Sequence, residues 1–456
     1  MTGAFSKKVE NWAAFLYFAR RMNVISYREP DFAAQLRRML APSSLFDPAI
    51  EEQTRAIVEA VRTRGDEALV ELTERFQGAR LTPDQFAVSH AEFMAASLQA
   101  DEALRAAIAE TTHNVEAFAK RSRRKDWSMR NGHGARVGEK FDPLRRVGIY
   151  IPGGAAPLVS TALMTIPLAR VAGCREIVVC TPCDRKGQVN AALLHATRQA
   201  GATEIYRIGG AQAIAAMALG TGAIGKVNKV FGPGNAYVVA AKRLLFGYAA
   251  IDLLPGPSEL LVLADETAHA ACIAADMLAQ AEHGSGHERV WLLTTSDKIL
   301  RAVQKEIERQ LPRLARRELI ERALAQNGWL VLLADMEQGI DLANRLAPEH
   351  LEVMCRQAER ITGRLVTAGA IFVGNDSPTV LGDYAAGPSH VLPAGGTGAS
   401  FAGLTVDQFQ RRTSVVNYSK SALKKALSAV RKFSEMEGLD AHGWSAEVRL
   451  RAKIRS

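Results

Sequence analysis

The sequence predicts an α/β protein with two Rossmann-like α/β domains, each built on a sheet rich in parallel strands. Three observations predict this fold. Short apolar segments that end in glycine turns alternate with helical segments over residues 146–255, and a second alternating set spans residues 256–404. Such alternation is typical of parallel sheets with crossover connections. The third observation is length, because 456 residues exceed what one ordinary core accommodates.

Residues 1–45 are expected to form an N-terminal extension or helical arm. The apolar run WAAFLYFA lies between charged residues and is not followed by a small-residue cleavage site. We therefore expect an amphipathic surface extension here and no secretory signal, with residues 1–21 dispensable.

Residues 50–125, within the segment of residues 46–145, are predicted to be helical. Ile57, Val58 and Val61 recur at helical spacing, with charged residues between the apolar positions. We assign this segment, together with residues 256–404, to one discontinuous α/β domain.

Residues 146–255 are predicted to form an α/β domain of their own. The segments VGIYIPGG, REIVVCTP, ATEIYRIGG and KVNKVFGPGN are apolar runs that end in turns, with helical stretches between them. Ligands of parallel sheets bind at the carboxyl ends of strands, where these turns lie. No G-x-G-x-x-G follows a first strand, so topology predicts a cofactor site without a phosphate-loop motif.

The second alternating set consists of the predicted strands ELLVLAD, RVWLLTTS, GWLVLLAD and AGAIFVGN. Helices are expected between them at residues 268–282, 298–310 and 337–346. From about residue 405 the chain turns polar, and residues 405–456 are predicted to form a C-terminal helical segment.

Composition narrows the function classes. The net charge of +9 favours anionic ligands, but the basic run at residues 120–125 has no interleaved aromatics, so we expect a solvated helix face and no nucleic-acid partner. No apolar run is long enough to span a bilayer, so no membrane partner is expected. Five cysteines indicate a reducing, cytoplasmic location, and the C-x-x-C at Cys180 and Cys183 is interpreted as a plain strand-end loop.

The stretch LAQAEHGSGH, residues 278–287, places donor atoms at the end of an apolar helix. Gln280 and His283 are three residues apart, so they share a helix face and could hold one metal ion. His283 and His287 have i, i+4 spacing, but the glycines between them should end the helix, so this second pair is weak. On this stretch alone, an ordinary helix end is the stronger interpretation.

Three further clusters contain chemistry-bearing residues. In LAPEHLEV, the adjacent Glu349 and His350 offer a water activator and a general base, and Pro348 is expected to start a helix there. The alternative is an ordinary first-turn pair. The long loop of residues 374–396 holds Asp383, a good hard metal ligand, and His390. Near the C-terminus, EGLDAHGW contains Glu437 and His442, and this motif alone is uninformative.

Taken together, the segments resemble the histidinol dehydrogenase family. The matching segments, in chain order, are VGIYIPGG, IGGAQAIAAMALGT, FGPGNAYV, IDLLPGPSELLVLAD, AQAEHG, APEHLE, GDYAAGPSHVLP and EGLDAH. The resemblance runs from about residue 23 to the C-terminus. It implies two NAD-dependent oxidations of L-histidinol, through an aldehyde to L-histidine, at one Zn²⁺ per site, as the last steps of histidine biosynthesis.

The resemblance implies a role for each matching residue. The implied zinc ligands are Gln280, His283, Asp383 and His442, the last from the partner subunit of a homodimer. The implied catalytic pair is His350 as base for both oxidations and Glu349 as activator of water. The implied substrate contacts are the four zinc ligands, His350, Ser258, His390 and Glu437. The implied NAD-site residues are Tyr150, Gln212 and Asn235. The resemblance thus implies that residues 146–255 are the NAD-side domain and that residues 46–145 with 256–404 are the catalytic domain.

Alternatives remain open at this point. Departures from the commoner family wording, such as PAGGTGASFAG after His390, leave room for a relative that oxidises another small alcohol, for example a sulfonated propanediol. The intact Glu437 and His390 favour histidinol. A zinc hydrolase could use the same ligands without NAD, although two α/β domains argue against it. A non-catalytic basic binding protein would account for the charge but not for the clustered ligands.

Overall fold

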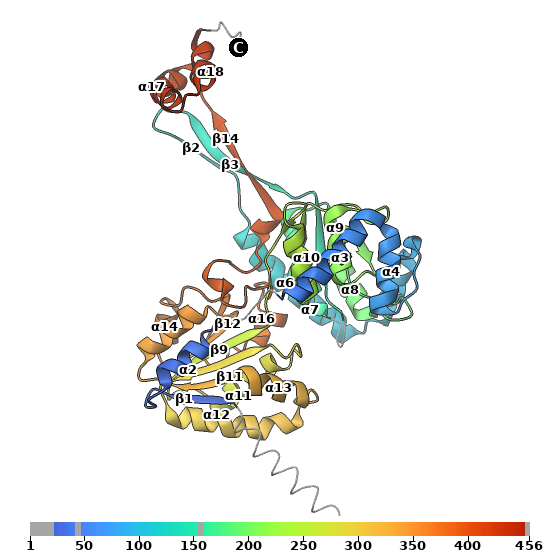
Figure 1. The fold of residues 1–456 in the computed structure, drawn as a ribbon, viewed down its shortest axis with the longest axis vertical. Helices are drawn as coiled ribbons and strands as arrows, with labels where there is room; N and C mark the ends of the chain where they lie inside the picture. The colour runs from blue at the N-terminus through green and yellow to red at the C-terminus, as the bar shows by residue number, and fades with distance from the viewer. Residues whose placement is uncertain (1–21, 42–46, 154–157, 452–456) are drawn as a thin grey trace, which may run out of the picture.

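The computed structural model describes residues 22–41, 47–153 and 158–451. These residues form two α/β lobes and a projecting arm, as Figure 1 shows. The predicted fold class of two Rossmann-like domains with parallel sheets is therefore confirmed. The expected surface extension at residues 1–21 lies outside the described residues.

The five-stranded lobe is built on a parallel sheet with strand order β6-β5-β4-β7-β8. Its strands are β4 (Arg146–Tyr150), β5 (Glu176–Cys180), β6 (Glu204–Tyr206), β7 (Lys229–Phe231) and β8 (Ala250–Ile251). The chain proceeds outward from β4 through β5 to β6, then returns to β7 on the other side of β4. The switch point between β4 and β7 is where sheets of this kind bind ligands.

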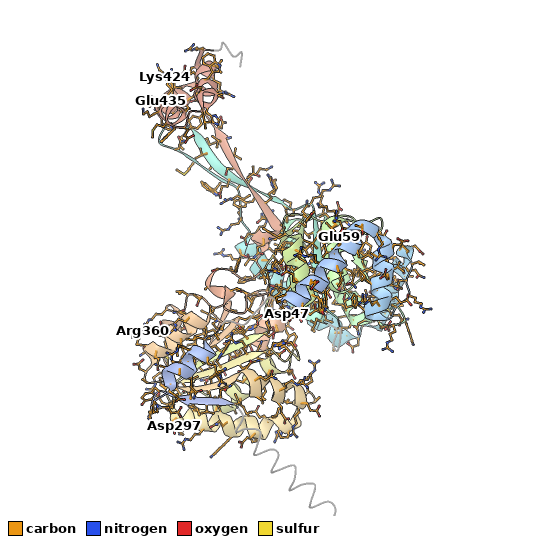
Figure 2. The ribbon with its side chains drawn as sticks, in the orientation of Figure 1. Asp47, Glu59, Asp297, Arg360, Lys424 and Glu435 are labelled. Carbon is orange, nitrogen blue, oxygen red and sulfur yellow. The ribbon has the colours of Figure 1, made fainter. Side chains whose placement is uncertain are left out.

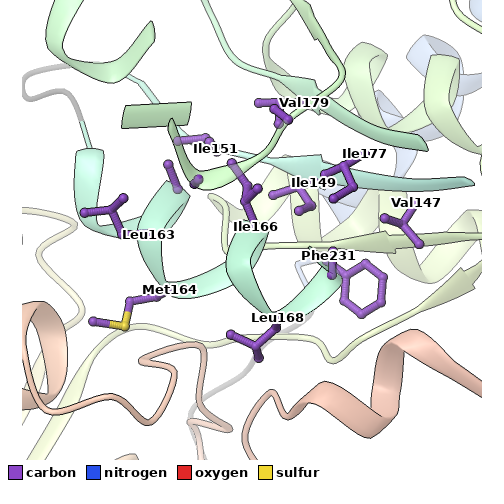
Figure 3. Packing of buried hydrophobic residues seen from close by; sticks show 14 of the residues in the cluster. Val147, Ile149, Ile151, Leu163, Met164, Ile166, Leu168, Ile177, Val179 and Phe231 are labelled. Carbon is purple, nitrogen blue, oxygen red and sulfur yellow. The ribbon is translucent and has the colours of Figure 1, made fainter. Parts of the chain in front are cut away.

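Helices cover both faces of this sheet. They are α3 (Pro48–Arg64), α4 (Asp66–Gln77), α5 (His90–Gln99), α6 (Glu102–Ser122), α7 (Val159–Ala172), α8 (Ala191–Ala200), α9 (Gly210–Leu219) and α10 (Ala236–Leu245). The helix α7 is apolar almost all round because it lies between the sheet and other helices. Figure 3 shows Ile166 and Leu168 of α7 packed with Ile149 and Phe231 of the strands.

The expected grouping of residues 46–145 with residues 256–404 is not what the packing shows. Ile57 and Leu72, from α3 and α4, share a core with α9 and α10. Val115 of α6 shares the other core with α7 and α8. Helical spacing predicted these helices correctly, but the same apolar stripe suits either sheet, so sequence alone could not choose between them.

The six-stranded lobe has the all-parallel order β1-β11-β10-β9-β12-β13. Its strands are β1 (Asn23–Ser26), β9 (Glu259–Ala264), β10 (Arg289–Thr294), β11 (Gly328–Leu332), β12 (His350–Met354) and β13 (Ala370–Val373). Its helices are α2 (Phe32–Met39), α11 (Ala270–Ala281), α12 (Asp297–Gln310), α13 (Arg317–Asn327), α14 (Met336–Leu346), α15 (Ala358–Thr362) and α16 (Val380–Tyr384). Part of the expected N-terminal extension therefore belongs to this lobe, as β1 and α2.

The prediction of a helix that starts at Pro348 is wrong, because the chain enters the strand β12 two residues later. Ala347 adopts a left-handed φ of 46° at the C-cap of α14, which stops that helix. Residues 350–354 then pair with β9 on one side and β13 on the other. All five residues of the strand are buried, including the polar His350 and Glu352 on the face opposite Leu351 and Val353.

The arm is an antiparallel ribbon that ends in a helical hairpin. The ribbon has the order β14-β3-β2, from β2 (Trp127–Arg130), β3 (Arg136–Pro143) and β14 (Gln410–Asn417). The hairpin is α17 (Lys420–Met436) and α18 (Asp440–Arg451). The expected C-terminal helices are confirmed, but β14 was missed. Figures 1 and 2 show the hairpin, with Lys424 and Glu435 labelled, far from both lobes.

No helix in the described ranges is long and apolar enough to cross a membrane.

Candidate active site

A cleft of about 1130 Å³ lies between the two lobes. Pro152, Gly234 and Asn235 line it from the five-stranded lobe. Residues that line it from the six-stranded side and its loops include Ser258, His283, Glu349, His350, Asp383 and His390. Six of the predicted site residues from distant parts of the sequence thus meet, with Asn235, in one cavity.

The two sheets present opposite edges to this cleft. The five-stranded sheet contributes the carboxyl ends of β4 and β7, as expected from its topology. The six-stranded sheet contributes its amino edge instead, because Ser258 precedes β9 and His350 is the first residue of β12. The carboxyl-edge rule therefore locates only half of this site.

The backbone of Glu259 holds both residues of the predicted catalytic pair. Its N–H donates to Glu349 Oε2 at 2.9 Å, and its carbonyl accepts from His350 Nδ1 at 3.0 Å. A carbonyl can only accept, so Nδ1 carries a proton and Nε2 is left for chemistry. Both side chains are almost fully buried beside the cleft. This arrangement suits a general base of fixed orientation.

The charge balance around His350 favours its protonated form. Burial alone would lower the pKa of His350, but the adjacent Glu349 carboxylate and the nearby Asp383 raise it to about 9. A base must be neutral to accept a proton. Any positive charge that bound at Asp383 would offset that carboxylate and bring the pKa of His350 back toward neutrality.

Gln280 and His283 lie where α11 ends. Gln280 is buried in its last turn, and His283 follows directly after the helix. His283 Nδ1 donates to the carbonyl of Gln280 at 2.9 Å, which leaves Nε2 as a free lone pair facing the cleft. The expected end of the helix before His287 is confirmed, so the weak second histidine pair gains no support.

A buried carboxylate stabilises the turn after His283. Glu288 accepts from the backbone N–H groups of Ser285 at 2.6 Å and Gly286 at 2.9 Å. Gly284 and Gly286 adopt φ values of 90° and 79°, which residues with side chains rarely adopt. The turn therefore has a defined shape behind His283.

Asp383 lies among three histidines. His390 Nδ1 lies 3.6 Å from Asp383 Oδ1. Burial raises the pKa of Asp383, but His390, His350 and His283 together hold it below its ordinary value. The carboxylate is therefore ionised at neutral pH and available as a metal ligand.

The lobes alone supply an incomplete metal site. In the parts of the chain that the structure describes, no group of three or more His, Cys, Asp or Glu residues could hold a metal ion. Among the residues that the structure describes, Gln280 Nε2 is buried and has no hydrogen-bond partner, and amide nitrogen and oxygen are interchangeable assignments. A buried amide with an unpartnered atom, three residues from His283, fits a metal ligand.

The structure does not bring Glu437 and His442 to this cleft. Glu437 follows α17, His442 lies on α18, and both are exposed. Figure 1 shows the hairpin at the far end of the arm, whereas Asp47, which lines the cleft, is labelled at the junction of the lobes in Figure 2. A single chain therefore cannot place these two residues beside Asp383.

The three predicted NAD-site residues lie at the carboxyl edge of the five-stranded sheet, but only Asn235 lines the cleft. Asn235 caps α10 through a bond from Val238 N. Tyr150 is buried, its hydroxyl accepts from Gly210 N at 3.0 Å, and burial raises its pKa to about 12. Gln212 is buried on α9. Tyr150 and Gln212 therefore lie against the glycine turn of residues 208–210 and not in the cleft itself.

The C-x-x-C has no reactive character. Cys180 is fully buried at the end of β5, and burial raises the thiol pKa of Cys180 and of Cys183. Reactive cysteines have lowered pKa values and solvent access. The interpretation as a strand-end loop is consistent with this.

Sequence reasoning missed three buried carboxyl-bearing residues near the site, Asp276, Glu259 and Glu352. Each has less than a tenth of its surface exposed. A charged residue inside an otherwise apolar strand or helix was the available signal, because such residues are rarely buried without a specific partner.

The fold and the cleft define a two-lobed α/β enzyme with a histidine–glutamate pair beside nitrogen and oxygen donors. The sequence model of the family described as histidinol dehydrogenase matches residues 42–450. Histidinol dehydrogenase from Geobacillus kaustophilus strain HTA426 is 45% identical over 403 residues, covering 88% of this chain and 94% of that protein. The Heliobacterium mobile histidinol dehydrogenase is 43% identical over 411 residues, covering 90% and 96%.

A solved structure agrees with these relatives. The crystal structure of histidinol dehydrogenase from Elizabethkingia anophelis matches with a TM-score of 0.90 and 35% identity, over 94% of this chain and 98% of that chain. The chain belongs to the histidinol dehydrogenase family, and it is an oxidoreductase.

Proposed function

We propose that the chain oxidises L-histidinol to L-histidine through L-histidinaldehyde, in two NAD-dependent steps at one zinc site. These are the last steps of histidine biosynthesis. The cleft carries the proposal, because His350 and Glu349 meet His283 and Asp383 there. The name shared by the family and its relatives supports histidinol as the substrate.

The proposed zinc ligands are Gln280, His283 and Asp383 of one subunit with His442 of the partner subunit. The donor set of two imidazoles, a carboxylate and an amide oxygen suits Zn²⁺. The hydrogen bond that fixes His283 Nδ1 is the usual support of a metal-binding imidazole. Zinc, when bound, supplies Lewis-acid polarisation and a fixed point for the substrate.

His350 is the proposed base in both oxidations. In the first step Nε2 takes the hydroxyl proton of the alcohol while the carbon-bound hydrogen leaves as hydride. In the second step Glu349 orients a water that adds to the aldehyde, and His350 takes a proton from the resulting hydrate. NAD, when bound, would supply the hydride acceptor for each oxidation.

Ser258, His390 and Glu437 are the proposed further substrate contacts. Ser258 and His390 line the same cleft as His350. Glu437, from the partner subunit, would add a carboxylate suited to the amine or imidazole of histidinol. The zinc ligands and His350 complete the proposed substrate-binding set.

The five-stranded lobe is the proposed NAD side. Asn235 lies at the N-terminus of α10 and lines the cleft, where free backbone N–H groups favour an anionic group. Tyr150 and Gln212 act in this proposal by holding the glycine turn of residues 208–210 in shape.

The position of the arm supports a homodimer. Its hairpin exposes large apolar side chains, among them Phe433, Met436 and Trp444, which a monomer would leave in water. Seating each hairpin on the partner would cover this surface and deliver His442 and Glu437 to the partner's cleft. The five cysteines are all free thiols, which supports the cytoplasm as the proposed location.

The test is to measure NADH formed per L-histidinol, with and without a zinc chelator. The expected result is two NADH per histidinol, lost on chelation and restored by added zinc. A protein that holds zinc but forms no NADH from histidinol would contradict the substrate and favour a relative with another alcohol. Zinc-dependent hydrolysis without NAD would contradict the reaction class.

A further inference from the structure

Two buried carboxyl groups lie beneath the candidate site, and the proposed chemistry leaves them without a role. Glu352 is fully buried on β12, and Asp276 is 7% exposed on α11. The two side chains lie beside each other, because each carboxyl alters the pKa of the other. Burying two carboxyls at a helix–sheet contact destabilises the fold unless they have partners, so their presence calls for a reason.

One of these carboxyls holds the start of the helix that carries Asp383. Glu352 Oε1 accepts from the backbone N–H of Thr379 at 3.0 Å. Thr379 is the N-cap of α16, and it is buried. Asp383 lies one turn further on, with its own N–H directed to the Thr379 carbonyl. The carboxyl of Glu352 therefore fixes where this short helix begins.

The second carboxyl oxygen of Glu352, Oε2, can bond to Asp276 only if one of the two carboxyls carries a proton. Glu352 Oε2 has no hydrogen-bond donor among the described residues. Two ionised carboxylates offer only acceptors, so one of the pair must be protonated to bond to the other. Burial raises the pKa of both groups, and the charge of Asp276 raises that of Glu352 further.

The pair also connects two other segments of the site. Asp276 and Gln280 are four residues apart on α11 and so share a helix face. Glu352 and His350 are two residues apart on β12 and so share a strand face. Three separate elements, α11, β12 and α16, therefore meet at this contact.

We propose that the Asp276–Glu352 pair positions Gln280 and Asp383 relative to each other and thereby sets the metal affinity of the site. The inference rests on the proposed function in that these two residues are metal ligands. Asp276 and Glu352 are positioning residues and touch neither metal nor substrate. Residues that orient ligands typically change metal affinity about 10–100-fold when they are replaced.

The test is zinc affinity, measured by competition with a chelator on the full-length protein. Glu352→Ala removes the bond to Thr379 and the contact with Asp276, and is expected to weaken zinc binding about 10–100-fold. Glu352→Gln keeps an acceptor for Thr379 and a donor for Asp276, and is expected to retain wild-type affinity. Equal loss in both variants would overturn the proposal, as would unchanged binding in Glu352→Ala.

A neighbouring residue provides the matched control. Val353 is equally buried on the same strand but faces the opposite core, so Val353→Ala tests general loss of stability. Zinc affinity is expected to be unchanged in this variant, and a loss as large as that of Glu352→Ala would overturn the proposal. If the wild-type protein did not bind zinc, the proposed function would be overturned. The results with the variants test only the role of the Asp276–Glu352 pair.

A second variant covers the case in which Glu352→Ala does not fold. Thr379→Pro leaves both carboxyls in place and removes the N–H, and the φ of −55° at this position is open to proline. Weaker zinc binding is expected. Wild-type affinity in Thr379→Pro would overturn the link between Glu352 and the helix of Asp383.

Discussion

At the scale of single residues, the backbone of Glu259 orients the chemistry. Its N–H and carbonyl fix Glu349 and His350 at once. The side chain of Glu259 turns away toward Arg289, whose guanidinium lies 3.6 Å from it. Substitutions that keep the backbone course at Glu259 should therefore preserve the orientation of the catalytic pair.

Replacing Glu349 should shift the pH dependence of the reaction. His350 is active as a base only when neutral, and the Glu349 carboxylate raises its pKa. The rate of alcohol oxidation should therefore rise with pH through the pKa of His350. In Glu349→Gln that rise should move to lower pH, because the negative charge is gone. The measurement is kcat against pH with histidinol, and an unmoved profile would contradict the charge argument.

The same variant should separate the two oxidations. Only the second step adds water, so Glu349→Gln is expected to slow histidinaldehyde oxidation more than histidinol oxidation. Single-turnover rates with each substrate measure this difference. The exposed Glu359→Gln serves as a control and should leave both rates unchanged. Equal slowing of the two steps by Glu349→Gln would remove its special role.

The sequence indicated which residues form the candidate site, but it did not indicate the contacts that hold them in place. Spacing indicated that Gln280 and His283 lie together, and the glycines indicated the end of α11. The role of Glu259 could not be predicted, because it acts through backbone atoms that every residue possesses. The Asp276–Glu352 contact joins segments far apart in the chain, and one sequence contains no pattern for such a pair.

At the scale of elements, the ribbon of the arm is the feature that local patterns could not reveal. Its strands are half-exposed and carry many charges, so they lack the alternation of a core strand. β3 and β14 pair although more than 250 residues separate them. The strand β12 was mistaken for a helix because Pro348 was taken as a first-turn residue, whereas the chain begins a strand two residues later.

A glycine in the ribbon offers a test of the arm. A Cβ at Gly138 would lie 2.1 Å from the carbonyl oxygen of Trp127 on the neighbouring strand. Gly138→Ala is therefore expected to separate β2 from β3, to displace the hairpin, and to weaken zinc binding and dimer formation. Zinc content and sedimentation measure the two effects.

Gly132 is the matched control for this substitution, because a Cβ there meets nothing within 4 Å. Gly132→Ala should leave zinc content and dimer formation unchanged. Normal zinc content in Gly138→Ala, with the ribbon shown to be disturbed, would contradict the role given to the arm.

At the scale of the whole molecule, the predicted site residues are divided between the lobes and a distant arm. The fold class followed from the alternation of strands and helices, but the packing partner of residues 46–145 did not. Apolar stripes show that a helix packs, without showing on which sheet. The proposed place of His442, in the cleft of the partner subunit, likewise requires a homodimer. The sequence indicates this only through the resemblance to relatives.

Removing the arm's proposed ligand should leave the fold intact. His442 is exposed on α18, so His442→Ala creates no cavity and should change the melting temperature little in the absence of zinc. Zinc content and activity should both be lost. Retention of wild-type zinc content would show that His442 is not a ligand.

The most direct test of the account combines two inactive variants, His283→Ala and His442→Ala, in one dimer. Each mixed dimer would contain one complete site, made of the lobes of one subunit and the arm of the other. Co-expression with separate tags is expected to recover histidinol oxidation to about a quarter of the wild-type rate, because half of the dimers are mixed and half of their sites are complete. Recovery no greater than the sum of the two inactive variants would contradict a site shared between subunits.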